Sequence, residues 1–321
     1  MSKRLRFAWL LAAALPLAAA GQSFPAKAVH VVVPFPAGGA ADSIARIVTE
    51  RMSAAWGQAV LVENRSGAGG NVGADVVYRA EPDGYTLLSS PPGPLSINHN
   101  LYKSLTYDPT RFVPITVLCL SPNVISARNG FEPNSVKELI TYARANPGKV
   151  SYASQGNGST SHLSAAMLAS MAGLTMLHVP YKGEAPALTD LAGGRVDIFI
   201  GNLFAALKLQ QGGRIKLLGV ASEKRNPVAP DIPTVSEAGL PGFLSSAWFA
   251  LVAPPETPAA VARAINAAAV EALRSDEVRK KLLALGAEPV GGSNAETAAF
   301  IKEETRRWHK VIRDANVTLA N

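Results

Sequence analysis

The stretch VHVVVPFPAGGAADSIARIVTERM, residues 29–52, places an apolar run, a glycine-rich turn and a helical pattern in direct succession. The run 29–34 is almost continuously apolar, which is typical of a parallel strand covered on both faces. After the turn, Ile44, Val48 and Met52 recur on one face of a helix. A strand, a tight turn and a helix form the repeating unit of α/β folds, so this stretch predicts the α/β class.

The same unit recurs along the whole chain. Further strand-like runs are residues 60–64, 85–89, 150–154, 176–181, 196–200 and 215–221. About 300 residues remain after the N-terminal segment described below, which is more than one hydrophobic core usually serves. The sequence therefore predicts two domains, each with strands and helices of its own.

Helix boundaries are marked by capping signals. Ser135 and Glu138 have the spacing of a capping box, which opens a helix that should end at residues 146–148. Thr257 followed by Pro258 predicts an N-cap with proline in the first helical position. Near the C-terminus an apolar stripe predicts a last helix, and we expect its aromatic residues, like Trp248, to lie in the core. The members of that stripe are Phe300, Ile301, Trp308, Val311 and Ile312.

Two extended segments suggest how the domains are joined. The middle of the chain carries a complete strand-and-helix set, and residues 113–125 and 215–221 flank it. We interpret both as crossovers between two doubly wound lobes: residues 21–124 with 223–321 as lobe 1, and residues 125–222 as lobe 2. Two crossovers make a hinge, and the groove between lobes is where a ligand would bind.

Residues 1–20 have the pattern of a secretory signal peptide. Lys3, Arg4 and Arg6 precede an apolar run that closes on the small residues 18–20. A buried N-terminal core helix would not need this combination, so we expect export to the periplasm. Cys119 is the only cysteine, which excludes an intramolecular disulfide and leaves no cysteine for a lipid anchor.

The charge pattern argues against nucleic-acid binding. Removal of residues 1–20 takes away three cations and no anions, so the formal net charge falls from +7 to +4. The remaining charges of both signs are spread along the chain, unlike the basic stripe of a nucleic-acid-binding protein. A mildly basic surface suits an anionic ligand.

Small residues follow several predicted strands and precede helices. The turns are FPAGGAAD (35–42), ENRSGAGG (63–70) and QGNGSTSH (155–162). Glycine permits close approach to the backbone, and the first N–H groups of a helix are unpaired and carry the positive end of its dipole. Such turns can bind a carboxylate. They can also be ordinary strand-to-helix turns, with Asp42 and Ser159 acting as helix caps.

No signature of catalysis or metal binding accompanies these turns. Residues 67–73 form only an imperfect dinucleotide-binding motif, which follows the second strand rather than the first. The five histidines lack metal-ligand spacing. His162 follows Ser159 and Thr160 within one helical turn, which is not the geometry of a nucleophile and its base, so we expect a cleft-lining or packed histidine. We predict no catalytic residue, no metal and no cofactor.

The order and wording of the segments resemble the Bug family, the extracytoplasmic receptors of tripartite tricarboxylate transporters. The segments are VVVPFPAGGAAD (31–42), VLVENRSGAGGNVG (60–73), EPDGYTLL (81–88), LTYDP (105–109), SVKELITYARANPGKVSYASQGNGSTSHL (135–163), HVPYKGEAPALTDLAGGRVD (178–197) and PTVSEAGLPGF (233–243). The resemblance covers nearly all of the chain after the signal peptide.

The resemblance implies a two-lobed Venus-flytrap fold of the type II-like periplasmic binding proteins, with the ligand carboxylate held by backbone amides and ordered water. Ala37, Gly38 and Gly39 would bind it from lobe 1. Gly156, Gly158, Ser159 and Thr160 would bind it from lobe 2. A large and a small membrane subunit of the transporter are the implied partners.

Other candidate contacts follow strands that should point at the cleft. Lys182 is a further candidate that could equally face water. The full set of expected ligand-binding residues is Phe35, Ala37, Gly38, Gly39, Asp42, Ser90, Gly156, Gly158, Ser159, Thr160, His162, Tyr181 and Asn202. We expect a monomer that captures a small carboxylate and performs no chemistry on it. A periplasmic sensing protein is the alternative, and an exported enzyme a weaker one.

One segment departs from the family pattern. Residues 89–96 contain three prolines and Leu95 where family members often carry small polar residues and a histidine. We hypothesise that this segment stiffens the cleft wall and that the ligand has a less polar distal portion, such as an aromatic or longer-chain carboxylate. The sequence does not identify the acid.

Overall fold

The computed structural model describes residues 24–318. The predicted signal peptide, residues 1–20, lies outside this range. Of the helices in the described part, none combines the length and apolarity that a membrane span requires.

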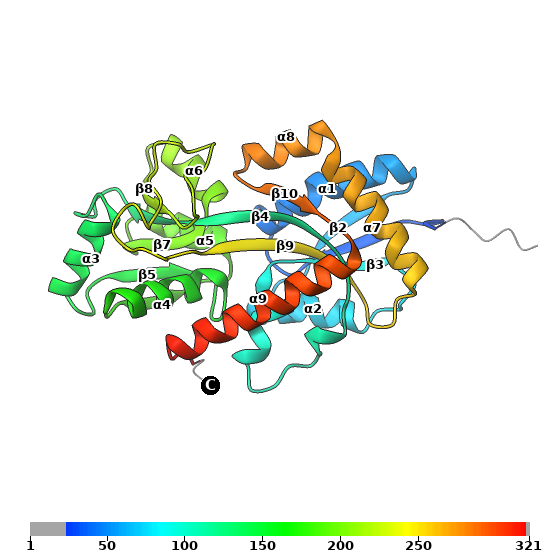
Figure 1. Ribbon diagram of the computed structural model, residues 1–321, viewed down its shortest axis with the longest axis horizontal. Coiled ribbons are helices and arrows are strands. Elements are labelled where there is room, and N and C mark those ends of the chain that lie inside the picture. Colours follow the sequence, from blue (N-terminus) through cyan, green and yellow to red (C-terminus); the bar gives the residue numbers. More distant parts are fainter. Residues whose placement is uncertain (1–23, 319–321) are drawn as a thin grey trace, which may run out of the picture.

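The element order alternates strands and helices, which confirms the α/β class (Figure 1). The strands are β1 Val29–Val33, β2 Val60–Asn64, β3 Thr86–Ser90, β4 Val113–Arg128, β5 Ser151–Ser154, β6 Leu177–Pro180, β7 Ile198–Asn202, β8 Ile215–Val220, β9 Ser246–Ala253 and β10 Glu288–Gly291. The helices are α1 Ala40–Trp56, α2 Asn71–Tyr78, α3 Val136–Ala145, α4 Thr160–Ala172, α5 Glu184–Ala192, α6 Leu203–Gln211, α7 Ala259–Arg274, α8 Asp276–Ala284 and α9 Asn294–Asp314. Each predicted strand is confirmed with ends that shift by at most two residues.

The strands form two parallel groups joined by two long antiparallel strands. Their order is β2-β1-β3-β9-β4-β7-β5-β6, with β8 and β10 paired to β4. Strand β1 runs parallel to β2 and β3, and β5 runs parallel to β6 and β7. The N-terminal half of β4 pairs with β9, and its C-terminal half pairs with β7 and β8. Strands β4 and β9 run side by side from one lobe towards the other (Figure 1).

The strand pairing assigns different roles to the two segments that the sequence predicts as crossovers. Residues 113–125 lie in β4 and do pass between the lobes, whereas β8, expected as the second crossover, pairs with the C-terminal half of β4. Val235 and Phe243, beyond the expected lobe boundary, pack in the core of the second lobe with Ile125 and Leu218. We therefore propose that β9 is the second crossover and that lobe 2 extends to about residue 245.

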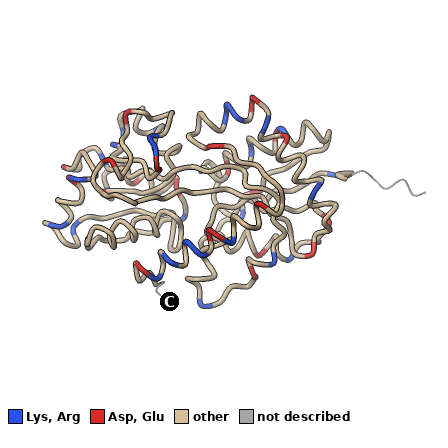
Figure 2. The backbone as a smooth tube through the Cα atoms, in the orientation of Figure 1, with Lys and Arg blue, Asp and Glu red and all other residues tan. Residues whose placement is uncertain are grey.

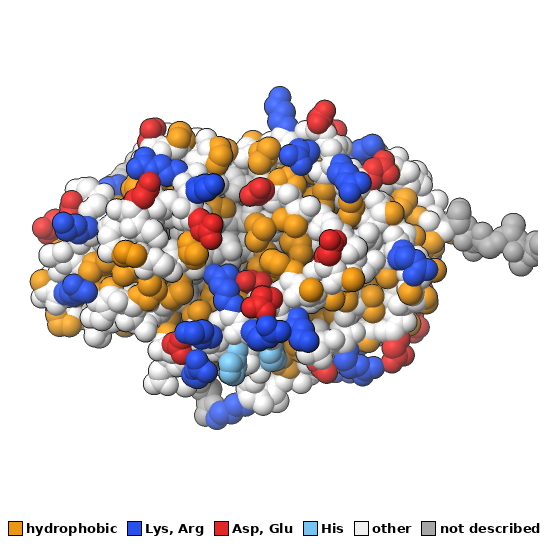
Figure 3. All heavy atoms as spheres, in the orientation of Figure 1, with side chains coloured by type: hydrophobic (Ala, Val, Ile, Leu, Met, Phe, Trp, Pro, Cys, Tyr) orange, Lys and Arg blue, Asp and Glu red, His pale blue; other side chains and the backbone are white. Residues whose placement is uncertain are grey.

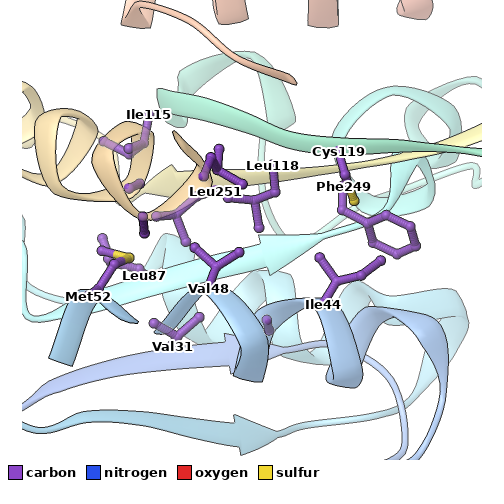
Figure 4. Packing of buried hydrophobic residues seen from close by; sticks show 14 of the residues in the cluster. Val31, Ile44, Val48, Met52, Leu87, Ile115, Leu118, Cys119, Phe249 and Leu251 are labelled. Atoms are coloured by element: carbon purple, nitrogen blue, oxygen red, sulfur yellow. The ribbon is translucent and has the colours of Figure 1, made fainter. Parts of the chain in front are cut away.

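The core of the first lobe shows why residues 29–52 fold as they do. Ile44, Val48 and Met52 of α1 point towards Val31 of β1 and Leu87 of β3 (Figure 4). Side chains of the neighbouring strands β4 and β9 join the cluster on the same face of the sheet, including Ile115, Leu118, Cys119, Phe249 and Leu251. Cys119 is a buried free thiol, and burial raises its pKa. This cysteine therefore behaves as a small core residue.

Helix α9 connects the two lobes at their surface. Trp308 is fully buried and packs with Leu163 of α4 and with Ile97. Trp248 is also fully buried, and its indole N–H donates to the carboxylate of Glu304 at 2.8 Å. Both tryptophans are core residues, as predicted.

Two predicted caps differ in detail from the structure. Pro258, not Thr257, occupies the N-cap of α7, and the Thr257 hydroxyl donates to the carbonyl of Pro254 instead. Ser135 caps α3, but the Glu138 carboxylate accepts from the N–H of Asn134 rather than from Ser135. In both places the side chain bonds to a backbone group of the preceding turn.

Charges of both signs are interspersed along the backbone (Figure 2). On the face drawn in Figure 3, lysines and arginines alternate with aspartates and glutamates. This distribution agrees with the sequence-based argument against a nucleic-acid footprint.

We predict that Leu87→Ala lowers the free energy of unfolding by about 2–5 kcal/mol, because Leu87 is fully buried and its truncation leaves a cavity. Leu61→Ala is the matched control, since Leu61 also lies in a strand of this lobe but is 46% exposed. We expect that variant to stay within about 0.5 kcal/mol of the original protein. Urea unfolding measures both, and equal losses would contradict the assigned core.

Candidate functional site

Four helices begin at one pocket between the lobes. Helix α1 follows β1, and α4, α5 and α6 follow β5, β6 and β7, so the pocket lies at the carboxyl ends of parallel strands. This is where open α/β sheets bind ligands. The lining residues are Phe35, Pro36, Gly39, Ala40, Ala41, Pro91, Gln155, Thr160, Glu184, Ala185, Pro186, Asn202, Ala247 and Phe249. The central cavity is narrow, about 30 Å³.

The turn before α1 is built around glycine and a buried carboxylate. Gly38 has φ +85°, a conformation that L side chains rarely adopt, and its N–H donates to Asp42 Oδ2 at 3.1 Å. Asp42 also accepts from Arg46 Nε and Asn64 Nδ2 at 3.0 Å each. Although burial opposes ionisation, these hydrogen bonds hold the pKa of Asp42 below its ordinary value. Asp42 therefore holds the turn in shape and does not line the pocket.

The turn before α4 is held in a similar way. Ser159 is the N-cap, and its hydroxyl accepts from the N–H of His162. Gly158 has φ +77°, and its N–H donates to His162 Nδ1 at 3.2 Å. Two further N–H groups of this helix start, those of Thr160 and Ser161, have no acceptor within the described residues. Thr160 faces the pocket.

His162 lies in a buried aromatic stack. Its ring lies 4.1 Å from that of His178 with an angle of 2° between them, and Tyr152 continues the stack. Burial lowers the pKa of both histidines to about 4. The Ser154 hydroxyl lies 2.6 Å from His178 Nε2, but Ser154 is fully buried and is not among the pocket residues. The Ser154–His178 pair therefore belongs to the packing around His162 and not to the pocket lining.

The expected contacts divide into two groups. Phe35, Gly39, Thr160 and Asn202 line the pocket, and Gly38 lines the adjoining cleft described below. The others lie near the pocket without lining it. They are Ala37, Asp42, Ser90, Gly156, Gly158, Ser159, His162 and Tyr181.

The reasons differ from residue to residue. The hydroxyl of Ser90 is buried and donates to the carbonyl of Pro91. The hydroxyl of Tyr181 donates to Asp190 at 2.8 Å, and Lys182 is exposed. The second glycine-rich turn, 63–70, leads into α2 and contributes no residue to the pocket.

Leu95 was expected in the cleft wall, and this expectation is wrong. Leu95 is buried in the core of the first lobe with Val32, Tyr107 and Trp248. Segment 89–96 contributes Pro91 instead. Phe35 and Phe249 complete an apolar wall.

Glu184 is the one ionisable side chain among the described residues that line the pocket, and the sequence alone did not single it out. It is the first residue of α5 and only 7% exposed. Its Oε1 accepts from the backbone N–H of Asn202 at 3.2 Å and from Asn202 Nδ2 at 3.1 Å. Its Oε2 accepts from the N–H of Ala40 at 3.4 Å, across the gap between the lobes. Burial raises its pKa, while the bonds from Asn202 and Ala40 act in the opposite direction.

A second, more open cleft continues from the pocket through Gly39, Glu184 and Ala185. Lys208 and Arg214 lie at its rim, both exposed. Neither has a carboxylate at ion-pair distance among the described residues. The rim therefore presents positive charge to an approaching solute, which favours anions.

The polar groups of the pocket are mainly backbone N–H groups at helix starts. Within residues 24–318, no cluster of three or more His, Cys, Asp and Glu side chains is placed to hold a metal ion. The pocket instead gathers unpaired N–H groups and apolar surface. Helix starts of this kind bind anions through hydrogen bonds and the helix dipole.

Comparison with known proteins gives a consistent result. The profile described as "Tripartite tricarboxylate transporter family receptor" matches residues 44–317. Protein BugT of Bordetella pertussis is 36% identical, over 92% of this chain and 92% of that protein.

Two solved structures are similar over almost their whole length. Rpa4515 of R. palustris with adipate is 39% identical with a TM-score of 0.90, covering 92% of this chain and 99% of that one. MatC from Rhodopseudomonas palustris with bound malate is 36% identical with a TM-score of 0.85, covering 90% and 100%.

The stacked histidines His162 and His178 predict a specific acid sensitivity. Because their folded pKa of about 4 lies below the ordinary 6.5, the unfolded chain binds more protons between these pH values, and stability falls as the pH drops through this window. Each histidine contributes a loss of about 2 kcal/mol at pH 5. His178→Gln should remove about that much of the loss between pH 7 and 5, measured by urea unfolding.

The matched control is His309→Gln, which replaces an exposed histidine. That variant should keep the original pH dependence. If His178→Gln loses as much unfolding free energy between pH 7 and 5 as the original protein does, the stacked histidines do not titrate in this window.

Proposed function

The chain belongs to the tripartite tricarboxylate transporter receptor family, and from this premise we propose that it captures a small carboxylate between its lobes and delivers it to a membrane transporter of the tripartite tricarboxylate type. Members of this family are periplasmic solute receptors rather than enzymes. We further propose that residues 1–20 direct export and that the large and small membrane subunits are the partners. The convergence of helix starts from both lobes on one pocket is the observation that carries the proposal.

The pocket chemistry supports a carboxylate. The N–H groups of Thr160 and Ser161 have no acceptor within the described chain, and Thr160 lines the pocket. Charge-assisted hydrogen bonds contribute about 1.5–3 kcal/mol each, so several of them together supply a large share of the roughly 8 kcal/mol that micromolar binding requires. The relatives named above hold adipate and malate, both carboxylates.

We assign different roles to the two groups of residues near the pocket. Phe35, Gly39, Thr160 and Asn202 are proposed ligand contacts. Asp42, Gly158, Ser159 and His162 are proposed to hold the two turns in the conformation that presents their N–H groups. Capture proceeds by closure, in which the ligand bridges the lobes and the closed form is recognised by the membrane partner.

A thermal-shift screen of residues 21–321 tests the proposal. The screen contains mono-, di- and tricarboxylates, aromatic acids and acidic amino acids, with uncharged sugars as controls. An acid present at 100 times its Kd should stabilise the protein by about 2.7 kcal/mol. A selective shift with acids is the expected result, and a flat response from folded, ligand-free protein would overturn the carboxylate assignment.

Gly39→Val should weaken binding of the acid found in this screen at least tenfold, because the new side chain enters the pocket at the start of α1. The backbone of Gly39 tolerates the change: its φ is −84°, and a Cβ would meet only the Pro36 carbonyl at 3.9 Å. The melting temperature should therefore remain close to the original. Gly158→Val is a poorer test, since a Cβ there would lie 2.9 Å from Leu101.

Ala259→Val is the matched control, because it adds the same side chain at the exposed start of α7, outside the pocket. Titration calorimetry compares the affinities of the original protein, Gly39→Val and Ala259→Val. Unchanged affinity in Gly39→Val would remove the start of α1 from the binding site.

A further inference from the structure

Glu184 places a carboxylate of the protein itself where a ligand carboxylate would be expected. Its two oxygens accept from Ala40 at the start of α1 and from Asn202 at the start of α6. Neither helix start has a side-chain cap. Glu184 therefore already supplies the acceptor that these two helix starts require.

Asn202 adds a second acceptor beside Glu184. Its Nδ2 donates to both oxygens of Glu184, and its Oδ1 is buried without any hydrogen-bond partner in the described chain. A buried acceptor without a donor is unfavourable, by about 1–3 kcal/mol. Asn202 lines the pocket and is 4% exposed, so a donor on a bound solute would satisfy this atom.

A third helix that begins at the pocket has unused donors. They are the N–H groups of Thr160 and Ser161 at the start of α4. No carboxylate of the described residues accepts from these two N–H groups, so this helix start is where one ligand carboxylate fits. Phe35, Pro91 and Phe249 add apolar surface to the same pocket.

We propose that Glu184 and Asn202 select a ligand with a single carboxylate, which binds at the start of α4, and with a hydrogen-bond donor such as a hydroxyl at its other end. This inference rests on the proposed function and narrows its ligand class. A second carboxylate at the far end would meet the Glu184 carboxylate, and two adjacent carboxylates cannot both stay ionised without a large cost. The site thus discriminates against dicarboxylates.

The test uses matched probes: ω-hydroxy monocarboxylates and dicarboxylates of three to eight carbons, titrated calorimetrically at pH 7.5 into the mature protein. In the original protein we expect the hydroxy acid to bind at least tenfold more tightly than the dicarboxylate at the chain length that binds best. Glu184→Gln removes the charge while keeping the shape, and it should improve dicarboxylate binding at least tenfold.

Glu132→Gln is the matched control. Glu132 is exposed on the loop between β4 and α3, so this substitution removes the same charge outside the pocket. Its preference should equal that of the original protein. If Glu184→Gln does not fold, the relative affinity of the original protein for hydroxy acids and dicarboxylates still tests the proposed selection.

The outcomes separate this inference from the function on which it rests. Tighter binding of dicarboxylates by the original protein, or a preference that Glu184→Gln leaves unchanged, would overturn the role of Glu184 while the receptor remains a carboxylate receptor. Failure of every acid to bind either protein would overturn the proposed function, and this inference with it.

Discussion

The antiparallel pairing of β4 with β9 is the constraint on which the rest of the structure depends. Strand β4 runs over Val113–Arg128, long enough to pair with β9 in the first lobe and with β7 and β8 in the second. The ladder fixes the register between the lobes, because a slip of one residue would turn the buried face of each strand outwards. The parallel groups on either side consequently direct their carboxyl ends, and the helices that follow them, to one pocket between the lobes.

Most of the fold could be predicted from sequence, because each parallel strand is a short apolar run bounded by turn residues. The sequence predicts residues 113–125 only as an extended crossover, and it gives no prediction for β9 although residues 246–253 are largely apolar. A strand whose partner is more than one hundred residues away leaves no local sign of its pairing. For this reason we propose a later boundary for the second lobe than the sequence alone suggests.

The sequence predicts those parts of the site that depend on residues close together in the chain. The turns at Gly38 and Gly158 reveal themselves through glycine, and both take left-handed backbone angles. The sequence does not show which N–H groups of these turns stay unpaired. In the structure Asp42 accepts the N–H of Gly38, and His162 accepts the N–H of Gly158. Glu184 could not be recognised at all, since its role depends on Ala40, 144 residues away in sequence. The sequence shows only a glutamate after a glycine at a helix start.

The buried carboxylate also links binding to closure. In an open arrangement water would solvate Glu184, whereas between the lobes it depends on Asn202 and on the longer bond from Ala40. Burial of a carboxylate is costly unless donors replace the water, and burial indeed raises the pKa of Glu184. A solute that brings a donor to Glu184 and Asn202 would reduce this cost in the closed form alone. Such a solute would shift the population towards closure, because a ligand shifts a conformational equilibrium only by its difference in affinity for the two states.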